Sequence, residues 1–297
     1  MPTDFLLLAL CTLLGALLSR TSLCTVAGMQ QCLRERSVGG LRPMLVATCT
    51  AGLGLMSFAL LRPAGVVLPG QLPLGPGLLA GGALLGAGAL LNGACYLGSL
   101  QYVGRGNANF LLTLLGLGLA ARSASGGTMA GSPGRMPEAA VAMAGLAGFA
   151  LLLWLLLRSR QPIATYAAAA AGIVASGIYA WHPAWSYGVV VESLVHARRA
   201  MAPGLLAACM LFVGATIGAV LQHRWKFAAF EPVRATRCLA GGYVMGWGAH
   251  LVPGGNDMLL LWALPGLAAY GLVAYLAMLV TLAALLGAPL AKAVARR

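Results

Sequence analysis

The chain has 297 residues, of which 60% are apolar and only 8% are charged, and its mean hydropathy is +0.87. A soluble domain carries about 25% charged residues, so this composition excludes an ordinary water-soluble enzyme or binding domain. The net charge of +13 does not indicate nucleic-acid binding, because the basic residues stand singly or in pairs between apolar runs and form no basic stripe with interleaved aromatic residues.

Apolar runs of roughly 17–25 residues, the length that spans a bilayer, recur along the whole chain. The first run looks like a signal peptide, but Asp4 stands where a basic residue is usual, so we expect it to be retained as the first span. The predicted fold is an all-α multi-pass membrane protein with about nine transmembrane helices, and residues 1–297 form one integral membrane domain. The predicted spans are 3–19, 41–61, 74–92, 107–123, 137–157, 163–181, 201–222, 236–251 and 266–287.

The basic residues predict an orientation, because Lys and Arg mark cytoplasmic loops. With nine spans, fourteen of them fall on the side reached after the first span and five on the other side. This asymmetry predicts a periplasmic N-terminus and a cytoplasmic C-terminus in the inner (cytoplasmic) membrane of a bacterium.

Several connections between spans are themselves apolar, at residues 24–33, 95–103 and 256–264, and a similar one begins at Ser186 and contains Glu192. Each is too short to cross a hydrocarbon core of about 30 Å as a helix. They are therefore predicted to be short re-entrant helices that enter the membrane and turn back, covered there by protein or a watery cavity.

One glycine-rich segment occurs twice. The stretch LLAGGALLGAGALLNGACYLGS begins at Leu78, and CLAGGYVMGWGAHLVPGGNDM begins at Cys238, so that Cys95 of the first copy falls opposite Gly255 of the second. An odd number of predicted spans separates the copies, so we expect an internal inverted repeat, with pseudo-repeats at about 1–123 and 160–290. Inverted repeats with broken helices are typical of transporters.

Cys95 stands at the predicted start of a re-entrant helix, just after Gly93. Helix N-termini attract anions, and a neutral thiol there can donate a weak hydrogen bond to a soft anion. The alternative is a small residue that fills a tight bend. Cys24 follows Arg20 at another predicted start, and is either a second such thiol or an ordinary loop cysteine; the other five cysteines are expected to pack.

The second break contains Gly254, Gly255, Asn256 and Asp257. Asn256 or Asp257 is suited to N-cap the helix that follows; alternatively, Asn256 donates its amide to a substrate and Asp257 repels or relays charge, since acids within a membrane are costly. His250 is either a buried imidazole or a proton relay.

Arg105 is either a lone arginine that reaches toward the membrane interface or a residue that draws anions to the site. The sequence contains no phosphate loop, metal-ligand spacing or Ser-His-Asp arrangement, so no metal, cofactor or enzymatic activity is predicted.

Three stretches together resemble the YeeE/YedE family of membrane proteins, which is associated with uptake of thiosulfate and other sulfur compounds. They are GALLSRTSLCTVAG, GGALLGAGALLNGACYLGSLQYVGRGN and GGYVMGWGAHLVPGGNDMLLL. The resemblance implies an hourglass-shaped bundle in which three cysteines pass thiosulfate along a narrow path by S–H contacts. Cys24 matches the first cysteine and Cys95 the second. Where the family reads Gly-Gly-Cys-Asn, this chain reads Gly254-Gly255-Asn256, so the third thiol is missing.

The function expected from the resemblance is a transporter for thiosulfate or a similar inorganic sulfur anion. Some relatives work beside a small soluble sulfur-carrier protein, so the expected partners are the anion, membrane lipid and such a carrier on the cytoplasmic side, with no nucleic acid. Two alternatives stay open: a membrane sulfur-relay protein that forms a persulfide on Cys95, and a channel-like carrier for an unrelated solute that uses Asn256, Asp257 and His250.

Overall fold

The computed structural model describes residues 2–21, 23–62, 65–124, 134, 138–158, 162–183, 185–196 and 202–287. These residues fold into long helices joined by shorter ones, so the predicted all-α fold is confirmed. The long helices are α1 (Pro2–Arg20), α3 (Arg42–Leu61), α4 (Pro76–Asn92), α6 (Leu111–Ser123), α7 (Ala139–Leu157), α8 (Ile163–Trp181), α10 (Ala202–Leu221), α11 (Pro232–Leu251) and α13 (Ala269–Gly287). Two short 3₁₀ turns, η1 (Val38–Leu41) and η2 (Ala108–Phe110), precede α3 and α6.

Within the described ranges, seven helical stretches are long and apolar enough to cross a membrane; they contain α1, α3, α4, α7, α8, α10 and α13. The multi-pass membrane fold is therefore confirmed. The count of nine stays a prediction, because α6 has only 13 residues and α11 carries Arg234 and Arg237 in its first turns.

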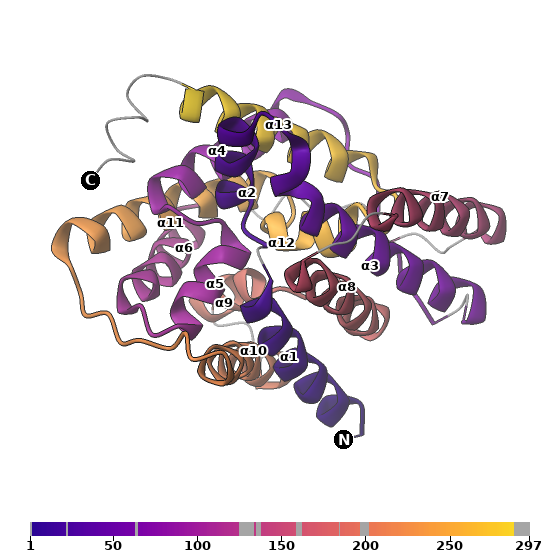
Figure 1. The fold of residues 1–297 in the computed structure, drawn as a ribbon, viewed down its shortest axis with the longest axis horizontal. Helices are drawn as coiled ribbons and strands as arrows, with labels where there is room; N and C mark the ends of the chain where they lie inside the picture. The colour runs from indigo at the N-terminus through magenta and orange to yellow at the C-terminus, as the bar shows by residue number, and fades with distance from the viewer. Residues whose placement is uncertain are drawn as a thin grey trace.

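Four short helical segments lie in the described part of the chain between consecutive long helices. They are α2 (Thr25–Glu35), α5 (Tyr96–Gly104), α9 (Tyr187–Val195) and α12 (Asn256–Met258), which continues as the π-helix η3 (Leu259–Ala263). Figure 1 shows α5, α9 and α12 near the centre of the molecule, whereas α2 begins there and runs to the surface, where most of its residues 30–35 are exposed.

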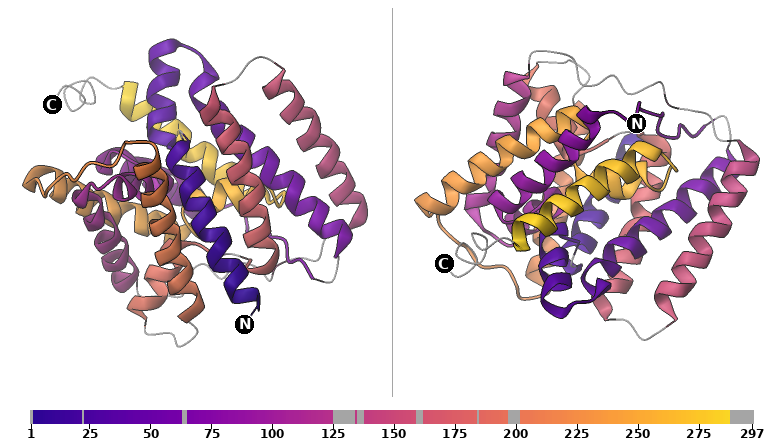
Figure 2. Two further views of the ribbon diagram at one scale, coloured as in Figure 1. Left: turned by 60° about the horizontal axis from the view of Figure 1, so that its bottom comes forward. Right: turned by 90° about the horizontal axis from the view of Figure 1, so that it is seen from above.

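The order long helix, short helix, long helix occurs twice within residues 2–123 and twice within 163–287. This order supports the pseudo-repeats predicted at 1–123 and 160–290, which stay a prediction. The additional helix α7 packs against α3 at the outer edge of the bundle (Figure 2). Its buried residues are only Ala142 and Gly145, so most of its surface is left to face lipid.

The duplicated glycine-rich segments pack against each other, because they form α4 and α11, which are in contact. A side chain at Gly88 of α4 would place its Cβ 2.6 Å from the backbone nitrogen of Met245. A side chain at Gly248 of α11 would place its Cβ 2.7 Å from the backbone nitrogen of Leu85. The two helices approach so closely that only glycine fits at these positions, as is common where helices associate within lipid.

We expect Gly248→Val to destabilise the protein by about 1–3 kcal/mol, because the added atoms would push α4 and α11 apart. Gly148→Val in α7 is the matched control, since no atom lies within 4 Å of a Cβ at that position. The melting temperature of each variant in detergent, measured by loss of monodisperse protein, checks the expectation. Equal melting temperatures for the two variants would contradict the close packing of α4 on α11.

Candidate functional site

The four short helices begin at residues with extended backbone, namely Cys24, Cys95, Ser186 and Gly255. Cys24 and Cys95 therefore occupy helix starts, at the positions that the sequence predicts. Glycines in the left-handed conformation turn the chain just before two of these starts: Gly93 has φ 79° and Gly254 has φ 80°. Residues other than glycine rarely adopt this conformation, so Gly93 and Gly254 shape the breaks that position the site.

Asn256 joins the starts of two other short helices. Its side chain is fully buried, and its Oδ1 accepts a hydrogen bond of 3.1 Å from the backbone N–H of Tyr96 at the start of α5. Its Nδ2 donates a hydrogen bond of 3.2 Å to Thr25 Oγ1 at the start of α2. Asn256 thus lies among the chain breaks that follow α1, α4 and α11.

The two cysteines lie at the same junction. Cys95 Sγ accepts a hydrogen bond of 3.3 Å from the backbone N–H of Thr25, and it also interacts with the side chains of Cys24 and Asn256. Both thiols are free. Cys95 is 0% exposed and Cys24 is 8% exposed, so the structure describes a closed arrangement in which the two thiols touch each other.

Gly98 of α5 makes room for Cys24. A Cβ at position 98 would lie 2.6 Å from Cys24 Sγ, so any larger residue would displace this thiol. The position of the Cys24 sulfur beside α5 therefore depends on a glycine one turn into that helix.

Asp257 connects the remaining short helix. Its side chain is 5% exposed, and Oδ2 accepts a hydrogen bond of 2.7 Å from Ser186 Oγ at the start of α9. Ser186 Oγ in turn accepts a hydrogen bond of 3.1 Å from the backbone N–H of Gly188. The dipeptide Asn256-Asp257 therefore contacts the starts of all three other short helices.

The expectation that Asn256 or Asp257 N-caps its own helix is wrong. The N-cap residue is Gly255, and it makes no side-chain capping bond. Since the helix already begins at residue 256, the side chains of Asn256 and Asp257 bind neighbouring segments instead.

Position 255, where the resemblance would place a third cysteine, lies against an aromatic ring. A Cβ at Gly255 would lie 2.7 Å from Cγ and Cδ1 of Tyr96, and a Cβ at Gly188 would lie 2.8 Å from Cε1 of the same ring. Tyr187 packs beside it, with ring centroids 5.6 Å apart, and its hydroxyl donates to the Tyr96 carbonyl oxygen at 2.9 Å. Asp257 Oδ1 lies 2.7 Å from the same Cβ position, so the Tyr96 ring and this oxygen together occupy the space that a side chain at position 255 would need.

Three residues considered from sequence lie outside this cluster. Arg20 is exposed at the end of α1, and His250 is half-buried and packs edge-on against Trp247. Arg105 follows α5 at the end opposite Cys95, about 14 Å along the helix axis. There its backbone carbonyl accepts a hydrogen bond of 2.9 Å from Lys226 N, so Arg105 lies outside the hydrogen-bonded cluster. Its side chain is half-buried, however, and its charge interacts with Cys24.

Several residues of the cluster were missed in the sequence, although each had a local signal. Thr25 and Tyr96 directly follow the two cysteines, and Ser186 begins the fourth short apolar segment. Asn92 is a polar residue within an apolar run: it is buried, and its Nδ2 donates to Ala94 O at 2.7 Å and to Ser99 Oγ at 2.8 Å. These bonds fix the break between α4 and α5.

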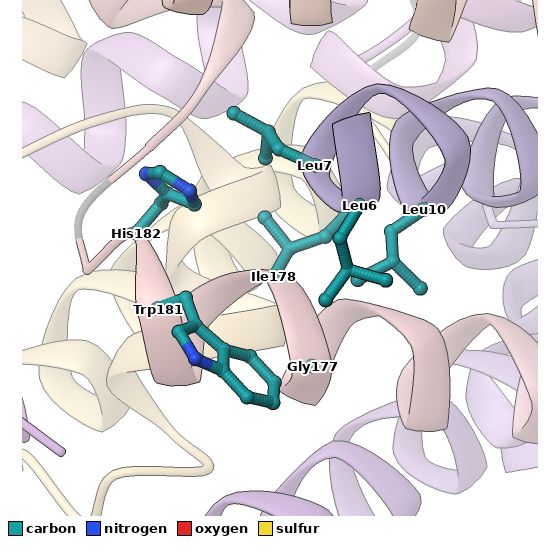
Figure 3. Close-up of a pocket in the computed structure, with 7 residues that line it drawn as sticks. All are labelled: Leu6, Leu7, Leu10, Gly177, Ile178, Trp181 and His182. Carbon is teal, nitrogen blue, oxygen red and sulfur yellow. The ribbon is translucent and has the colours of Figure 1, made fainter. Parts of the chain in front are cut away.

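A separate hollow lies on the side of the bundle between α1 and α8 (Figure 3). Its lining is mostly apolar, and Leu6 and Trp181 at its rim are exposed, so it opens toward the lipid-facing surface. It shares no residue with the cluster at the helix starts, and its apolar walls are unsuited to a small anion. Its lining residues are Leu6, Leu7, Leu10, Gly177, Ile178, Trp181 and His182.

A multi-pass bundle with broken helices that meet at buried polar groups is the architecture of a membrane transport protein. The family model described as sulphur transport matches residues 20–159, just under half of the chain, and this match confirms the resemblance to the YeeE/YedE family. The matched range contains Cys24 and Cys95 and ends before the second break. No curated protein matches the chain.

We expect Asn256→Ala to lower stability by about 1–3 kcal/mol, because the Tyr96 N–H would be left buried without a partner. Gln31→Ala is the control: Gln31 is also an amide, but it is exposed and pairs with Glu35 on the surface of α2. Melting temperatures in detergent compare the two. Equal melting temperatures for Asn256→Ala and Gln31→Ala would show that Asn256 does not hold the helix starts together.

Proposed function

We propose that this chain transports thiosulfate, or a similar inorganic sulfur anion, across the cytoplasmic membrane of a bacterium, with its N-terminus periplasmic and its C-terminus cytoplasmic. One observation carries the proposal: two free, buried thiols lie at the starts of two short helices, in contact with each other and with Asn256. The match of residues 20–159 to the sulphur-transport family model supports the same substrate class.

The chemistry of the site suits a soft anion. Neutral thiols donate weak hydrogen bonds and carry no charge that would repel the substrate, while the N–H groups at the starts of α2 and α5 favour negative charge. The backbone N–H of Thr25 now donates to Cys95 Sγ, and an anion between the two cysteines would accept this bond instead. Weak, exchangeable bonds let an anion enter the path and also leave it.

The third donor in this path is an amide. Gly255 supplies no side chain, and Tyr96 and Asp257 Oδ1 fill the space beside it. Asn256 is the amide on this break that reaches another helix start, with its Nδ2 donating to Thr25 Oγ1. We therefore infer an order of two thiols and one amide along the path, with all three side chains buried.

Passage requires the helix starts to separate. Cys95, Thr25 and Asn256 are each 0% exposed, so their mutual contacts close the path in this structure. An arriving anion would replace these contacts one by one. A small soluble sulfur-carrier protein on the cytoplasmic side is the proposed recipient of the sulfur.

We expect Cys95→Ala to lower thiosulfate uptake roughly 10- to 100-fold, since it removes a hydrogen bond to a charged ligand. Cys24→Ala should act in the same direction. Cys49→Ala is the matched control, because Cys49 is equally buried but lies within α3, away from the helix starts. Uptake of labelled thiosulfate into proteoliposomes measures the effect, with sulfate and sulfite as competing anions.

Undiminished uptake by the Cys95→Ala variant would rule out a mechanism in which the anion passes by way of the Cys95 thiol. Mass spectrometry of the wild-type protein after exposure to thiosulfate adds a second readout. A persistent additional sulfur atom on Cys95, without uptake, would favour a sulfur-relay protein over a transporter.

We expect Gly255→Cys alone to destabilise the protein by about 1–3 kcal/mol, because its Cβ would collide with the Tyr96 ring. The double variant Gly255→Cys with Tyr96→Ala should recover much of this loss, since the ring is gone. Melting temperatures of the two single variants and the double variant form a thermodynamic cycle. Strictly additive effects would contradict the conclusion that the ring occupies the third side-chain position.

A further inference from the structure

One acidic side chain is buried at the proposed path. The chain has six acidic residues; all six lie in the described ranges, and Asp257 is the only one of them that is buried. Acids within a membrane are costly and commonly take part in ion or proton movement. The role of Asp257 in holding α9 requires only one of its oxygens, the Oδ2 that accepts from Ser186.

The other oxygen accepts no hydrogen bond from another side chain. Oδ1 of Asp257 is buried and makes no hydrogen bond of standard geometry among the described residues, although the backbone N–H groups of Asp257 and Met258 interact with the carboxyl. The titratable groups that interact with this carboxyl are the phenols of Tyr96 on α5, Tyr179 on α8 and Tyr187 on α9. None of these groups is cationic, and none of the interactions recorded for Asp257 in the described part of the chain involves Lys, Arg or His.

A carboxylate in this setting has no cation beside it, and only the Ser186 hydroxyl and the N–H groups of Asp257 and Met258 stabilise it. A second negative charge nearby would therefore favour the neutral carboxyl group. Its neighbour Asn256 contacts Cys95 and Thr25, so an anion bound there lies one residue from the carboxyl. Two negative charges held beside adjacent residues repel each other strongly in a low-dielectric site. Binding of the anion and binding of a proton to Asp257 therefore favour each other.

The geometry points to Asp257 as a proton-binding site that couples anion movement to a proton, a role that rests on the proposed function. A proton from the outer water binds Oδ1 while the anion binds at Cys95 and Asn256. Both cross together, and the proton is released to the inner water after the anion leaves. In the emptied site, the Ser186 hydroxyl donates to Oδ2 and stabilises the carboxylate until the next proton arrives.

Proteoliposomes with the membrane potential clamped at zero test this coupling. For the wild-type protein, an inward proton gradient should raise thiosulfate accumulation several-fold, and an internal pH dye should report acidification that depends on thiosulfate. For Asp257→Asn, which keeps the shape of the side chain, exchange of labelled for unlabelled thiosulfate should continue at equal pH. Accumulation driven by the proton gradient and the acidification should both disappear in this variant.

Glu192→Gln is the control, since Glu192 is a half-buried acid on α9 whose charge also acts on Tyr96 but which is not among the groups that interact with Asp257, and this variant should retain both activities. Accumulation driven by the proton gradient in the Asp257→Asn variant would overturn the inference. Loss of both exchange and accumulation in this variant would also overturn it, because Asp257 would then be needed for anion binding or for folding. Wild-type uptake that does not respond to the proton gradient, or that depends on a sodium gradient, would also overturn it. Absence of any wild-type uptake would instead refute the proposed function.

Discussion

The closed junction at the centre of this protein depends on the hydrogen bonds of two adjacent side chains. Asn256 binds the starts of α2 and α5, and Asp257 binds the start of α9. Within a membrane, backbone groups at broken helices must find partners inside the protein, because lipid offers none. Four chain breaks can therefore meet in the bundle only if polar side chains there form hydrogen bonds with the free backbone groups. Asn256 and Asp257 supply several of these hydrogen bonds.

The long helices make the meeting of these breaks possible. Glycines at the contact of α4 with α11 let the two backbones approach closely, as the positions of Gly88 and Gly248 show. The break that follows α4 and the break that follows α11 are then near enough for Asn256 to reach the Tyr96 N–H. Close helix packing and site geometry are in this way two consequences of the same duplicated segment.

The energetics of the junction fit the movement of an anion. Each contact that closes it is an ordinary hydrogen bond, with a net contribution of about 1 kcal/mol, so a bound anion can replace several of them. An inside-negative potential opposes anion import by about 2.3 kcal/mol per charge for each 100 mV. On the proposed path, an amide and thiols in their neutral form would not add to this opposition, and a proton that travels with the anion would reduce it.

The membrane class, the helical fold and the breaks at Cys24, Cys95 and the Gly254-Gly255 pair follow from the amino-acid sequence alone. These features are local: apolar length, glycine content and turn chemistry act within a few residues of each other. Three contacts required the tertiary structure. Asn256 binds Thr25, 231 positions away. The Tyr96 ring lies in the space beside Gly255, and Asp257 binds Ser186. Such contacts depend on how distant helices pack against each other. The order of residues within one segment therefore does not identify the residue that it will contact in another segment.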